Sequence, residues 1–274
     1  MIMYEIHCAP SRIETHTDVR LAFEPKGWQL EYRPELRQAL RALEAVPGEV
    51  LVAELITDDD RFFDVENVLL YNVGASSFRH LTTEGIVFRR VTGRSAAATY
   101  TATYEVAIAP DWFAGREPVA HWDFEMNRLS SSTKTHEAWW AMRTGRIEVV
   151  GDAVGVFGLD LLVTPPAGRV ANVAGFAKPL LDGVVCALHK EEGTISPEAT
   201  AWLANDLRIT EREVAKGLAG PAAPLGAVRL VRATSAGVQW NPADHLCHEV
   251  RIRVEAPTGD AWSVAGTLVE PPLQ

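Results

Sequence analysis

The chain has 274 residues, of which 47% are hydrophobic and 23% charged, a composition that is ordinary for a globular protein and excludes wholesale disorder. Its net charge of −10 excludes a generally basic nucleic-acid-binding module, so any role with nucleic acid would need a local basic patch. No apolar run approaches the ~18 residues of a membrane span, and the first residues lack a signal-peptide pattern. We therefore expect a soluble, cytoplasmic protein that does not contact membranes.

The first part of the chain, residues 1–110, contains one predicted helix and several predicted strands. The helix covers residues 34–44, where leucines at 36, 40 and 43 recur at the spacing of one helix face and a proline suits the first turn. Segments rich in β-branched and aromatic residues predict the strands. These predicted strands are residues 50–56, 86–88 and 99–108, with an acidic loop at 57–60.

The second part, residues 111–274, repeats this order of elements. Predicted helices cover residues 136–143 and 176–188, and predicted strands cover residues 154–163, 227–231 and 249–254. The last strands of the two parts also match, with Glu-Val-Ala-Ile at 105–108 and Glu-Val-Arg-Ile at 249–252. The shared order predicts an α+β fold of two similar halves, a tandem pseudo-repeat with mixed sheets and packed helices.

A helical insertion separates elements of the second half at about residues 196–224. Ser196-Pro197-Glu198 is typical of a helix start, and Thr210 with Glu213 fits a capping box for a second short helix. Glycines at 217 and 220 would end that helix. We expect this insertion to form a small helical pair beside the core.

The strongest local signal for chemistry is acidic. Three aspartates at 58–60 are followed by Asp64-Val-Glu66-Asn67, and carboxylates two residues apart at the end of a strand can converge on one Mg²⁺ ion. The alternative is a solvated acidic loop that caps the next helix, because Asp and Asn are good N-caps. Both interpretations fit the sequence.

The order helix, strand, acidic turn, lysine helix and downstream acids resembles the RusA-type Holliday-junction endonucleases. That resemblance implies a small homodimer in which aspartates bind Mg²⁺ and a lysine assists cleavage. Lys178-Pro-Leu-Leu-Asp-Gly resembles the lysine helix of the family, but Asn172 and Ala174 stand where its aspartates would be. Asp64-Val-Glu66-Asn67 resembles the aspartate core, but Leu70 stands at the lysine position.

The resemblance supports two hypotheses about function. In the first, the chain is a non-catalytic or divergent descendant of a duplicated RusA-like nuclease fold that binds a macromolecular partner, either a protein or a nucleic acid. In the alternative, it is a Mg²⁺-dependent, endonuclease-like enzyme. Asp64 and Glu66 would then hold the metal, Glu84 would complete the catalytic site, and Lys178 would reach across from the other half. A third class, a small-molecule enzyme with a cleft between the halves, has no residue signature.

Other motifs give weaker evidence for a functional site. His245, Cys247 and His248 follow Asp244, but the segment runs into a predicted strand and lacks a full zinc ligand set. Alternating polar residues at 121, 123 and 125 predict an exposed strand face, with Trp122 and the phenylalanine at 124 facing the core. The three cysteines are not at metal-binding spacing and predict free thiols. No glycine-rich phosphate loop indicates a nucleotide cofactor.

Overall fold

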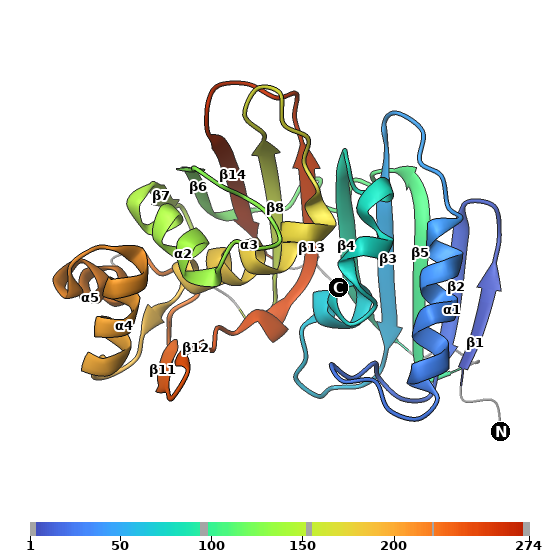
Figure 1. Ribbon diagram of the computed structural model, residues 1–274, viewed down its shortest axis with the longest axis horizontal. Helices are drawn as coiled ribbons and strands as arrows, with labels where there is room; N and C mark the ends of the chain where they lie inside the picture. The colour runs from blue at the N-terminus through green and yellow to red at the C-terminus, as the bar shows by residue number, and fades with distance from the viewer. Residues whose placement is uncertain (1–3, 94–97, 152–154, 221, 271–274) are drawn as a thin grey trace.

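The computed structural model describes residues 4–93, 98–151, 155–220 and 222–270. These residues form a mixed α+β fold built on one ten-stranded sheet, which confirms the predicted class (Figure 1). Within them, no helix has both the length and the apolar character needed to cross a bilayer. Residue 154, where we predicted a strand to begin, lies outside the described residues.

The large sheet has the strand order β1-β2-β5-β3-β4-β13-β8-β14-β6-β7. Its strands are β1 (Tyr4–Cys8), β2 (Arg12–Thr17), β3 (Glu49–Thr57), β4 (Gly85–Thr92), β5 (Tyr100–Ile108), β6 (Pro118–Met126), β7 (Arg146–Val149), β8 (Phe157–Thr164), β13 (Cys247–Val254) and β14 (Trp262–Val269). Strands β4 and β13 meet antiparallel at the centre. Each then has a parallel neighbour, β3 or β8, which in turn pairs antiparallel with β5 or β14. The sheet is therefore continuous across the two parts of the chain.

The first three helices cover one face of this sheet, whereas the last two pack beside it (Figure 1). The helices are α1 (Gln29–Arg41), α2 (Thr135–Thr144), α3 (Val173–Leu188), α4 (Pro197–Leu207) and α5 (Glu211–Ala219), with short turns η1 (Asn67–Tyr71), η2 (Ala75–Ser77), η3 (Arg79–Leu81) and η4 (Asp244–Leu246). Short strands β9 (Lys190–Glu191) and β10 (Ala227–Val228) pair with each other, as do β11 (Val231–Thr234) and β12 (Gly237–Trp240). The pair α4 and α5 lies beside the core, as expected for the insertion (Figure 1).

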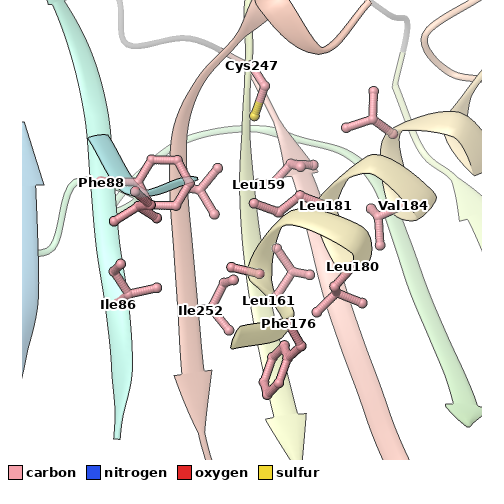
Figure 2. Close-up of a cluster of buried hydrophobic side chains, with 14 of the residues drawn as sticks. Ile86, Phe88, Leu159, Leu161, Phe176, Leu180, Leu181, Val184, Cys247 and Ile252 are labelled. Atoms are coloured by element: carbon pink, nitrogen blue, oxygen red, sulfur yellow. The ribbon is translucent and has the colours of Figure 1, made fainter. Parts of the chain in front are cut away.

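Helix α3 packs across the centre of the sheet. Figure 2 shows its apolar side chains, Phe176, Leu180, Leu181 and Val184, above side chains of β4, β8 and β13. Phe88 of β4 is fully buried in this layer. A fully buried side chain of this kind contributes roughly 1.5–3 kcal/mol to folding. Because α3 covers strands from both parts of the chain, it fixes the residues on its polar side relative to both.

Several local predictions are confirmed. Ser196 caps α4 by accepting a hydrogen bond from the Ala199 backbone N–H, and Thr210 and Glu213 form the expected capping box of α5. Along β6, the polar residues at 121, 123 and 125 are exposed while Trp122 is 3% exposed. All three cysteines are free, with Cys8 exposed and the other two buried.

Helix α1 begins earlier than predicted. It starts at Gln29, so Pro34 lies inside the helix instead of in its first turn. The amide of Gln29 fixes the preceding loop by bonding Ala22 and Arg20, which anchors the extra turn. Proline has no N–H for the carbonyl four residues earlier, that of Leu30, and because Leu30 is 60% exposed, water can reach that region.

Candidate functional site

A cluster of four carboxyl groups surrounds Lys178 on the polar side of α3. Lys178 Nζ donates to Glu66 Oε1 at 2.8 Å and to Asp182 Oδ1 at 3.3 Å. Asp182 lies one helical turn beyond Lys178, whereas Glu66 comes from the segment between β3 and β4. Asp64 and Asp244 complete this group, which we call the carboxylate cluster, and Asp244 shares a side-chain hydrogen bond with Asp64.

The local structure of residues 64–71 explains why two acids only two positions apart have different surroundings. Asn67 closes the turn by donating from its side chain to Asp64 Oδ2 at 2.5 Å and from its backbone to the Asp64 carbonyl. The next residues enter the core, with Leu69 fully buried and its carbonyl accepting from the Tyr104 hydroxyl at 2.9 Å. This arrangement turns Glu66 inward, so that its side chain is 10% exposed.

The cluster holds more negative charge than its single lysine balances. Burial raises the pKa of Glu66 to about 7, although the nearby Lys178 ammonium opposes the shift. Burial also raises the pKa of Asp182, and burial followed by repulsion from Asp64 raises the pKa of Asp244. Burial alone would lower the pKa of Lys178, but the surrounding carboxylates outweigh it and raise that pKa. The lysine is therefore the cation that stabilises the ionised carboxylates.

Asp64 lies on the wall of two neighbouring cavities. One, of about 430 Å³, is lined by Phe23, Phe62, Tyr71 and Lys178 among others. The second, of about 330 Å³, is lined by Phe62, Asp244 and His245. The rings of Phe23 and Tyr71 stack with their centroids 5.8 Å apart, and the ring centroids of Phe62 and His245 lie 4.5 Å apart. Aromatic surface and acidic groups thus meet at one place.

The structure brings together three of the four predicted catalytic residues, namely Asp64, Glu66 and Lys178. Glu84 is not among them: it is exposed and accepts a hydrogen bond from the Gly48 N–H at 3.1 Å. Phe88 of β4 lines a small hollow together with Glu66. Glu84 precedes β4 and stands four residues before Phe88, which corresponds to about 13 Å along the strand.

Two members of the carboxylate cluster were not predicted. Asp182 stands in the Lys178-Pro-Leu-Leu-Asp-Gly segment, where its spacing from the lysine places both on one helix face. Asp244 stands beside the histidines that we considered as metal ligands. Its position depends on the η4 turn before β13, and nothing in the sequence indicates which segment that turn contacts.

The acidic loop before this cluster has a different role. Asp59 accepts two hydrogen bonds from the Arg61 guanidinium, both at 2.8 Å, and a third from the Tyr100 hydroxyl. These bonds, chiefly those of Arg61, lower the pKa of Asp59 well below its usual value despite its burial. Asp59 is thus a structural partner of Arg61 and Tyr100.

No three His, Cys, Asp or Glu side chains in the described ranges are grouped so that they could hold a metal ion. Glu66, one of the two predicted Mg²⁺ ligands, binds Lys178. Near the other candidate, burial, reinforced by Arg90, lowers the pKa of His248 to about 4, and the Cys247 thiol lies 3.7 Å from the Glu249 carbonyl. Within the described residues, the side chains at both places thus make internal contacts.

Comparisons with protein-family models, with curated proteins and with solved structures found no match for this chain.

Proposed function

We propose that this chain is a non-catalytic binding protein that arose by duplication and fusion of a RusA-like unit, and that it binds a macromolecular partner next to the carboxylate cluster. The observation that carries the proposal is the pair of contacts from Lys178 Nζ to Glu66 at 2.8 Å and to Asp182 at 3.3 Å. An ammonium group occupies the place among these carboxylates that a divalent cation would take in a metal-dependent nuclease.

The order of strand pairings supports the duplication. Outward from the central β4–β13 contact, the first neighbour on either side is parallel and the next two pairings are antiparallel. Such an order is what two copies of one unit would give if they met antiparallel, as two subunits meet across a twofold axis. The two outermost strands differ in chain order, because β1 precedes its neighbour β2 whereas β7 follows its neighbour β6. This difference would then reflect later divergence.

The loss of catalysis follows from the demands of Mg²⁺. This ion requires near-octahedral oxygen ligands at about 2.0–2.1 Å, and it must compete with any cation already present. Glu66 would have to release Lys178 to bind it, and Glu84, at the start of β4, is not available to complete the ligand set. The motif residues thus stabilise the fold by an internal ion pair.

Exposed aromatic side chains support partner binding at the same place. Phe62 is 79% exposed, Phe23 68% and Tyr71 46%, and all three line the cavity that Asp64 borders. Large exposed aromatic residues around a hollow are typical of the few residues that dominate binding energy in protein interfaces.

A second candidate function is Mg²⁺-dependent cleavage of nucleic acid. The contact between Asp64 and Asp244 favours this function. The repulsion between two adjacent carboxylates is reduced when either a proton or a cation lies between them. Lys178 would then stabilise negative charge on the phosphate as the bond breaks.

Three measurements separate these functions. Calorimetric titration with Mg²⁺ and Mn²⁺ should give no binding heat, and branched or linear DNA should not be nicked. Chemical crosslinking should recover complexes of this protein with its partner. Phe62→Ala should abolish these complexes. Ile108→Ala is the control, because Ile108 is 80% exposed but lies away from this surface, and it should retain them. Metal-dependent nicking that Asp64→Asn abolishes would instead establish the second function, and retention of the complexes by Phe62→Ala would contradict binding at this surface.

A further inference from the structure

A separate cavity, of about 450 Å³, lies against the β11–β12 hairpin and differs in character from the carboxylate cluster. Its lining consists of Arg229, Arg232, Gln239 and Asn241. All four side chains carry N–H donors, and none is a carboxylate. In a protein of net charge −10, a cavity lined by two guanidinium and two amide groups is a local exception.

The hairpin and the residue that follows it hold three of these donor side chains on one side. Arg232 and Gln239 are direct cross-strand partners, so their side chains point to the same face. Asn241 lies two residues beyond Gln239, and its backbone N–H donates to the Leu230 carbonyl at 2.9 Å, which continues the ladder. Asn241 therefore shares the face of Gln239.

The opposite side of the hairpin packs against the core. Val231 is buried, Val238 and Trp240 pack against the core cluster, and the ring centroids of Trp240 and Trp139 of α2 lie 5.3 Å apart. The hairpin thus has a packed side and a side that faces solvent. Because its position is set by this packing, the donors on the solvent side are held near one another before any ligand arrives.

The guanidinium groups in this cavity are available for a ligand. Both Arg229 and Arg232 are exposed, and in the described part of the chain neither lies within 4.0 Å of a carboxylate oxygen, the distance of an ion pair. The charge of Arg229 acts on the carboxylate of Glu191, and this carboxylate already accepts a hydrogen bond from the Val231 N–H at 2.9 Å. The Glu191 carboxylate thus offsets part of the Arg229 charge without forming an ion pair with it, and within the described residues neither arginine is held in a direct ion pair.

We propose that this cavity is a binding site for a phosphate group. A phosphate monoester carries a charge of about −1.5 to −2 and three strong acceptor oxygens. Two guanidinium groups offer planar pairs of donors that match such oxygens, and the two amides can satisfy the remaining lone pairs. A carboxylate has one charge and two oxygens, so it leaves more of these donors without a partner.

The site shares no charged residue with the carboxylate cluster, so it can be tested independently of the function proposed above. Inorganic phosphate and O-phosphoserine would each be titrated into the full chain and followed by ³¹P NMR, with acetate as a competitor. The double variant Arg229→Gln/Arg232→Gln should bind phosphate at least about tenfold more weakly. Arg212→Gln removes an exposed arginine of α5 and should bind as the unchanged protein does.

Each outcome has a defined meaning. Tighter binding of O-phosphoserine than of inorganic phosphate would assign the site to a phosphate ester, and the reverse order would assign it to free phosphate. Binding should weaken as sodium chloride is added, since both arginines are exposed. No binding of either probe, competition by acetate at equal concentration, or full affinity in the double variant would overturn the proposal.

Discussion

Two acidic regions of this molecule, only a few residues apart in the chain, show how surroundings decide what a carboxylate does. Asp59 is ionised and held by Arg61 and Tyr100, which lower its pKa. Glu66 is buried with three further carboxyl groups and a single lysine, and burial raises its pKa to about 7. The same kind of sequence signal therefore produces a stable ion pair in one place and a charge imbalance in the other.

The largest expected effect comes from removing the lysine that binds two acids of the carboxylate cluster. Lys178→Met leaves Glu66 and Asp182 buried without their partner, which we expect to lower the free energy of unfolding by about 3 kcal/mol at pH 7. Urea unfolding followed by fluorescence measures this loss. Lys216→Met, which changes an exposed lysine of α5, is the matched control and should cost less than about 0.5 kcal/mol.

A second variant sharpens the same comparison. In Lys178→Met/Glu66→Gln the buried carboxylate is neutral as well, so the double variant should be more stable than Lys178→Met alone. If the double variant were less stable instead, the lysine would be acting through its packing and not through the charge that it balances.

A smaller effect is expected from pH. Because the folded pKa of Glu66 is raised, the native state binds more protons than the unfolded state above the ordinary value of 4.5 and up to about 7. Stability should therefore fall as pH rises through this window. Glu66→Gln removes the carboxyl group that titrates. From pH 5 to pH 8 the free energy of unfolding of this variant should fall by on the order of 2 kcal/mol less than that of the unchanged protein. Parallel curves for the two proteins would show that Glu66 does not titrate in this range.

Sequence reasoning located part of the carboxylate cluster because part of its signal is local. Asp64 and Glu66 stand in one short motif and Lys178 in another, and the matching order of elements around them indicated that the two motifs could meet. Asp244 joins them only through tertiary packing at η4, before β13, and no periodicity records that contact. The sequence pattern thus predicts which residues are chemically capable, and the fold decides which of them meet.

The same limit applies to secondary structure. We predicted one strand at residues 227–231, but the chain forms β10 and then β11 with different partners. Beyond β10, Glu191 accepts a hydrogen bond from the Val231 N–H and takes the place of a backbone partner. Apolar alternation predicts that a segment is extended, but it cannot show where the segment changes its neighbour.

The smallest expected effect concerns Asp59, the other half of the comparison. Asp59→Asn weakens its contacts with Arg61 and Tyr100, and because Arg61 is 66% exposed, we expect a loss of only about 1 kcal/mol at pH 7. A lowered folded pKa stabilises the native state above the ordinary value of 3.8, so this loss should shrink as pH falls below that value. Glu66→Gln should show the opposite trend, with its advantage growing as pH rises. Thermal unfolding of both variants between pH 3 and 8 measures the two slopes, and slopes of the same sign would mean that the two acidic regions do not differ in the way that their contacts indicate.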